Sequence, residues 1–97
     1  MATYIGNAFS LQMLGSFNAS VNVQKVEGFP ADAVSVVGHQ DTANVLGVAF
    51  NRVSVKLNQG DVLYVAQVVG GRLPEGATTL PEGFRMEFLK VEVAYND

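Results

Sequence analysis

The chain has 97 residues, of which 48% are hydrophobic and 15% are charged, and its formal net charge is −3 at pH 7. This length suffices for one packed core and is too short for two, so residues 1–97 are expected to form a single domain. The negative charge argues against nonspecific binding of long nucleic acid, but a small anionic ligand could still be held by one or two arginines. Such a small domain with few surface charges favours a homo-oligomer.

The chain contains no cysteine and one histidine, His39. Disulfides and thiolate metal sites are therefore excluded, and the scattered carboxylates do not resemble a calcium site, so we expect neither a metal nor another cofactor. No signal peptide is seen, and no window approaches the roughly 18 apolar residues that span a membrane. We expect a cytoplasmic protein that does not bind membranes.

The first half of the chain indicates strands followed by one short helix. Residues 4–9 form a short apolar segment, and Ser20–Val26 alternates between apolar and polar side chains as a half-buried strand does. Residues 33–37 are almost continuously apolar, which predicts a strand buried on both faces. Gln40–Leu46 could form two helical turns that end at Gly47.

The second half indicates a hairpin and a final strand. Residues 53–57 and Val62–Val69 flank the turn-forming residues 58–61, and this pattern predicts a β-hairpin. Residues 72–83 hold two Pro-Glu-Gly triplets and predict an irregular loop, while residues 84–95 alternate again as a last strand. The predicted fold is α+β: a single mixed sheet of about five strands with one or two short helices.

His39 is the first candidate for proton-transfer chemistry, because its side chain alone titrates near neutral pH without help from its surroundings. It follows Gly38, where the backbone can bend sharply and approach a ligand closely. A helix that starts at Gln40 would direct free amides toward the same place, which suits a phosphate. The alternative is that His39 only caps the helix and bonds to a neighbouring carbonyl, and its position alone favours that alternative.

Other polar residues at predicted strand ends have both a functional and a structural interpretation. Arg72 could hold a phosphate and Glu75 could orient His39 or a sugar hydroxyl, although both also suit a solvated turn. Asn7 and Ser10 follow the first strand, a common place for ligand-binding groups in open sheets. The remaining candidates are Arg52, a possible second cation before the hairpin, and Gln67, an amide that we expect to be buried in an apolar strand and to need a partner.

Taken together, these segments resemble a known family, the small viral ring nucleases. These proteins are antagonists of type III CRISPR defence that destroy cyclic tetra-adenylate, and they have homologues on bacterial mobile elements. The matching motifs, in order, are Asn7-Ala8-Phe9-Ser10, Gly38-His39-x-x-Thr42-Ala43, Asn51-Arg52-Val53, Gly60-Asp61-x-Leu63, Gln67 and Arg72-Leu73-Pro74-Glu75-Gly76. No single motif is specific, but their order covers nearly the whole chain.

The resemblance implies a homodimer that binds cyclic tetra-adenylate across its two-fold axis. A ribose 2′-hydroxyl would attack its own phosphodiester without a metal, a histidine matching His39 would protonate the departing 5′-oxygen, and Glu75 would support it. The ligand-binding positions implied are Asn7, Ser10, Gln12, Gly38, Arg52, Gln67 and Arg72. Because the substrate supplies the nucleophile, the protein needs only positioning, a proton donor and charge stabilisation.

The chain also departs from the family pattern. Residues 26–33 and 39–51 are shorter than the family's helical segments, residues 77–83 are too brief for its helical lid, and Gln12 stands where some members have an asparagine. The shortened lid motivates a second hypothesis, a protein that sequesters a cyclic oligoadenylate without cleaving it. A third is a small structural or protein-binding module of a virus or mobile element. Cleavage is the leading hypothesis.

Overall fold

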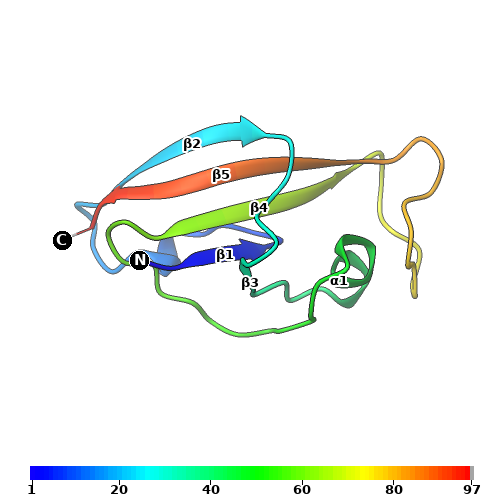
Figure 1. The fold of residues 1–97 in the computed structure, drawn as a ribbon, viewed down its shortest axis with the longest axis horizontal. Helices are drawn as coiled ribbons and strands as arrows, with labels where there is room; N and C mark the ends of the chain where they lie inside the picture. Colours follow the sequence, from blue (N-terminus) through cyan, green and yellow to red (C-terminus); the bar gives the residue numbers. More distant parts are fainter. Residues whose placement is uncertain (97) are drawn as a thin grey trace.

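Five strands form one mixed sheet in the computed structural model, which describes residues 1–96 (Figure 1). In chain order the elements are β1 (Thr3–Gly6), the 3-10 turn η1 (Leu11–Met13), β2 (Ser20–Val26), β3 (Val34–Ser35), the helix α1 (Gln40–Leu46), β4 (Val62–Val69) and β5 (Arg85–Tyr95). This architecture confirms the predicted α+β fold with one mixed sheet and short helical segments.

The sheet combines a parallel half with an antiparallel half. Its strand order is β2-β5-β4-β1-β3, with β5 antiparallel to both β2 and β4, and β1 parallel to both β4 and β3. The carboxyl ends of β1, β3 and β4 therefore meet at one end of the sheet. In Figure 1 this end faces α1 and the loop of residues 70–84, while the amino terminus lies at the opposite end.

Each face of the sheet has its own apolar core. On one face Leu63, Val65, Val91 and Val93 are buried together with Leu57, which comes from the irregular chain that crosses this face. On the other face the buried residues are Ile5, Val37, Ala43 and Ala66, and they include Ala43 of α1. Burial of Ala43 explains why so short a helix is stable, because tertiary packing supplies what seven residues cannot supply alone.

The predicted helix is confirmed at Gln40–Leu46. Gly47 ends it in the left-handed conformation, with φ of 73°, and its amide donates to the carbonyls of Ala43 and Asn44. A residue with a side chain would be strained at this φ, so the glycine is the local reason that the helix stops there.

The predicted hairpin of residues 53–57 and Val62–Val69 is wrong. Both edges of β4 are already occupied, by β1 on one side and β5 on the other, so residues 53–57 have no free edge to pair with. They cross one face of the sheet instead, where the amide of Leu57 donates to the carbonyl of Met13 over 2.7 Å. The alternation in the sequence reflects this role, because Leu57 is buried and Val55 is half-buried, while Lys56 is exposed.

The prediction that residues 33–37 form a strand buried on both faces is also wrong in extent. Only Val34–Ser35 form a strand, at the edge of the sheet, and Val34 is 55% exposed. An edge strand is covered on fewer sides than a central one, and here Val37 alone is fully buried. The first and last strands are likewise shorter than predicted, since β1 ends at Gly6 and β5 begins at Arg85.

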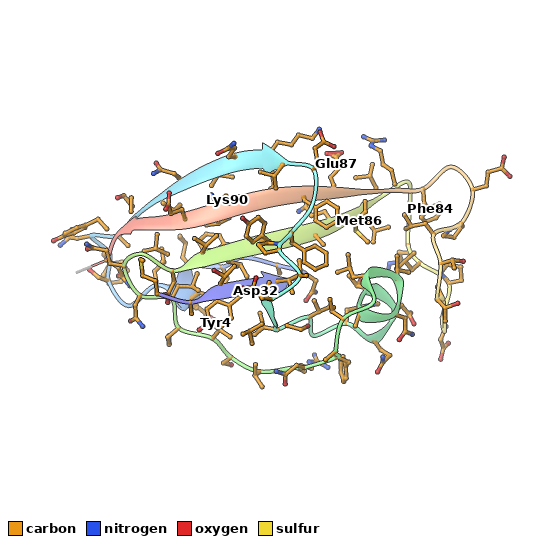
Figure 2. The ribbon with its side chains drawn as sticks, viewed as in Figure 1. Tyr4, Asp32, Phe84, Met86, Glu87 and Lys90 are labelled. Carbon is orange, nitrogen blue, oxygen red and sulfur yellow. The ribbon has the colours of Figure 1, made fainter. Side chains whose placement is uncertain are left out.

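An ion-pair cluster lies on the antiparallel half of the sheet, near Glu87 in Figure 2. The carboxylate of Glu87 lies 3.3 Å from Lys25 Nζ and accepts a hydrogen bond from Arg85 at 3.0 Å. The hydrogen bond with Lys25, followed by that from Arg85, holds the pKa of Glu87 below its usual value.

Val91→Ala should destabilise the domain far more than Val23→Ala. The two valines are opposite one another in the β5–β2 ladder, but Val91 is 2% exposed and Val23 is 57% exposed. Removing the same atoms from the buried position should lower the free energy of unfolding by about 2 kcal/mol, and from the exposed one by less than about 0.5 kcal/mol. Urea denaturation measures both, and equal losses would contradict the burial described.

Candidate functional site

A polar pocket of about 700 Å³ lies where the parallel strands end. Its wall includes Asn7 after β1, His39 after β3, Gln67 on β4, and Arg72 and Glu75 from the loop that follows β4. All of these were candidate residues from the sequence, and the fold brings them together from segments far apart in the chain.

Asn7 fixes the backbone beside His39. Its Oδ1 accepts a hydrogen bond of 3.0 Å from the amide of Gly38, which ties the end of β1 to the chain entering α1. Gly38 itself is closely packed, since a Cβ built there would lie 3.3 Å from Arg52 Cγ. Gly38 and Arg52 are therefore neighbours, and neither lines the pocket.

His39 occupies the N-cap position of α1 in an extended conformation, with φ of −128° and ψ of 118°. Its side chain makes no capping hydrogen bond, so the structural alternative of a helix-capping histidine does not describe it. The ring is exposed and lines the pocket, with Nδ1 at 3.5 Å from Thr42 Oγ1, the outer limit of a hydrogen bond. The imidazole is thus accessible to a ligand.

Arg72 and Glu75 are exposed and come from the β4–β5 loop, residues 70–84. The loop is narrow at its base, where Gly70 adopts φ of 122° and a Cβ built on it would lie 3.0 Å from the carbonyl oxygen of Gly83. Only glycine fits this conformation and this close approach. The sequence predicted the loop correctly but contained no sign of this narrow base.

Two polar residues of the pocket wall were not among the candidates, Asp41 and Thr42 in the first turn of α1. Thr42 could have been found, because it belongs to the Gly-His-x-x-Thr-Ala motif and a helix places it on the next turn after His39. For Asp41 the sequence showed only a carboxylate at the start of a helix. Such a carboxylate commonly stabilises a helix and does not indicate a site.

Ser10 and Gln12 are not among the residues that line this pocket. Ser10 precedes η1, and Gln12 lines a separate hollow of about 500 Å³ together with Leu11 and Phe17. Lys56 Nζ donates to the Gln12 carbonyl over 2.6 Å at that hollow. The structure therefore separates these two candidates from the others.

Gln67 lies at the pocket, but the expectation that it is buried is wrong. It is exposed near the end of β4, opposite Glu87 in the ladder. Its amide is free of the burial penalty that the sequence suggested and is available to a ligand.

The charges around the pocket are mixed. Arg72 is the cationic side chain in the lining, His39 contributes an imidazole, and Asp41 and Glu75 carry carboxylates. No group of three or more histidine, aspartate or glutamate side chains within residues 1–96 is arranged to hold a metal ion. In the same residues no helix is long and apolar enough to cross a membrane.

A mixed five-stranded sheet with a polar pocket at the carboxyl ends of its parallel strands defines a small α+β protein with a ligand-sized site at the sheet edge. The chain belongs to the STIV B116-like family, whose model matches residues 3–93. Its fold is similar to that of B116 of Sulfolobus turreted icosahedral virus, with a TM-score of 0.75 and 23% identity, over 95% of this chain and 99% of that chain. None of the curated proteins matches the chain.

Asn7→Ala should loosen the backbone that carries His39. The Gly38 amide loses its acceptor, so its hydrogen exchange should accelerate roughly tenfold, since one hydrogen bond contributes about 0.5–1.5 kcal/mol. Exchange measured by NMR tests this expectation. Asn7→Asp retains an oxygen at the same position and should exchange nearly as slowly as the parent; if it matches Asn7→Ala instead, the side-chain oxygen is not the acceptor.

Proposed function

We propose that this protein is a metal-independent ring nuclease that cleaves cyclic tetra-adenylate to linear di-adenylate and so switches off type III CRISPR signalling. The observation that carries the proposal is the position of His39, the single histidine of the chain, in one pocket with Arg72 and Glu75. The ordered motifs that resemble the viral ring nucleases supply these same residues.

The chemistry requires little of the protein beyond placement. A ribose 2′-oxygen attacks the adjacent phosphorus while its proton passes to solvent or a nearby base, and the bond from phosphorus to the 5′-oxygen breaks. The products carry a 2′,3′-cyclic phosphate on one side and a 5′-hydroxyl on the other. His39 donates the proton that the departing 5′-oxygen needs, a contribution that typically accelerates such reactions about 10²–10⁴-fold.

The other pocket residues have roles that suit their chemistry. The guanidinium of Arg72 binds a phosphate and stabilises charge that develops there. Glu75 orients the imidazole or accepts from a ribose hydroxyl, while the amides of Asn7 and Gln67 bind polar edges of the ring. Gly38 and Arg52, which pack against each other next to His39, support the backbone that carries the imidazole.

We also propose that the protein acts as a homodimer. A pocket of about 700 Å³ is in the range that suits a drug-sized ligand, and a ring of four nucleotides is larger. Two pockets related by a two-fold axis would share one ring and cut it at two opposite phosphodiesters, which yields two di-adenylates.

His39→Ala should abolish most of the cleavage. In EDTA, the parent should convert labelled cyclic tetra-adenylate to linear di-adenylate, and the variant should be slower by about 10²–10⁴-fold at unchanged fold and affinity. Chromatography of the products and sedimentation equilibrium, which should give two protomers, provide the measurements.

Each other result of that experiment has a definite meaning. Equal rates for the parent and the variant would remove His39 from the mechanism. An intact ring that both proteins retain would indicate sequestration, and an intact ring that neither binds would overturn the proposed function. Cleavage by the parent that stops in EDTA would contradict the metal-independent mechanism.

Glu75→Ala should reduce kcat at least about tenfold, whereas Glu82→Ala should leave it unchanged. Both glutamates are exposed, stand in a Pro-Glu-Gly triplet and belong to the same loop, but only Glu75 lines the pocket. Single-turnover cleavage compares the two variants directly. Equal losses would attribute the effect to the loop as a whole, and no loss in either would exclude a role for Glu75.

A further inference from the structure

The β4–β5 loop is tied to α1 by two hydrogen bonds. Asp41 Oδ1 accepts from the amide of Gly76 over 3.0 Å, and one turn later Asn44 Nδ2 donates to the carbonyl of Ala77 over 3.3 Å. The helix thus holds the loop immediately after Glu75.

Asp41 is an unexpected residue in a pocket proposed for an anionic ring. It is half-buried and lines the same pocket as Arg72, so its carboxylate repels phosphate at short range. A neutral side chain would bind an anion better, and the benefit of a carboxylate must therefore lie elsewhere. Besides its favourable place in the first turn of α1, the carboxylate accepts the hydrogen bond from Gly76.

The loop is held at two places, and the candidate side chains lie between them. At the base, Gly70 and Gly71 pack against Phe84, since a Cβ built on either glycine would lie 3.3 Å or less from that ring. Figure 2 labels Phe84 where the loop returns to the sheet. At the far side the loop is held to α1 by Asp41 and Asn44. Arg72 and Glu75 are separated by only two residues and lie between these two attachments.

We propose that Asp41 is a positioning residue that holds Arg72 and Glu75 in the pocket through its bond to Gly76, an inference that rests on the proposed function. Without this bond the segment from Arg72 to Gly76 is held to α1 only through the longer bond from Asn44 to the Ala77 carbonyl. Asp41 then affects cleavage of the cyclic tetra-adenylate through the position of the loop and does not touch the reacting atoms.

Hydrogen exchange tests the structural part of the proposal without any ligand. The Gly76 amide should exchange at least about tenfold faster in Asp41→Ala than in the parent, in line with loss of a hydrogen bond to a charged group. Asp41→Asn keeps an oxygen acceptor and should exchange within about threefold of the parent. Asp32→Ala, which removes an exposed aspartate elsewhere, is the matched control and should have no effect.

Cleavage kinetics test the positioning part. Asp41→Ala should lower kcat about tenfold, while Asp41→Asn should retain kcat and show an equal or lower KM, because it keeps the bond and removes the repulsive charge. In a Glu75→Ala background, Asp41→Ala should lower kcat by less than about threefold, because two residues that act through one contact are not additive.

The outcomes separate this inference from the proposed function. Unchanged exchange at Gly76 in Asp41→Ala, or full additivity with Glu75→Ala, would overturn the positioning role even if the parent cleaves the ring. If exchange accelerates as expected but the parent neither binds nor cleaves the ring, the proposed function fails and Asp41 is left as a purely structural link, which also overturns its positioning role in catalysis.

Discussion

The parallel pairing of β1 with both of its neighbours is the constraint on which the rest of the structure depends. Ile5 of β1 is fully buried, and the amide of Val36 donates to the Ile5 carbonyl over 2.8 Å, which carries the parallel pairing one residue beyond β3. Because three strands then run in the same direction, the chain leaves all three of them at the same end of the sheet. Asn7, His39 and the loop after β4 meet there for that reason alone.

This constraint also explains how much the sequence could reveal. The helix at Gln40–Leu46 and the strand at Ser20–Val26 were predictable, because capping glycine and strict alternation are local signals. Strand pairing is not local, so residues 53–57 looked like a partner of β4 although β1 and β5 already occupy its edges. The same limit applies to burial: an apolar neighbourhood in the sequence suggested that Gln67 is buried, and its place at the open end of the sheet makes it exposed.

The sequence identified which residues form the candidate site, but not how they are arranged in space. The motifs identified Asn7, His39, Arg72 and Glu75, all of which line one pocket. They could not show that Asp41 reaches the loop, because that contact spans 35 positions in the chain and joins two segments that no motif relates. Family membership supports the fold, whereas the pocket is defined by the mixed charges that the fold arranges around one imidazole.

The tight glycine base of the β4–β5 loop has an evolutionary consequence. Since Gly70 and Phe84 are in close contact, the ladder between β4 and β5 is closed before the loop begins, and its register does not depend on the length or composition of the loop. Residues can be inserted or deleted between these two positions at a small entropic cost and without moving a strand. The loop is therefore an exchangeable unit, and a lineage can change its length and its residues while the sheet beneath remains the same.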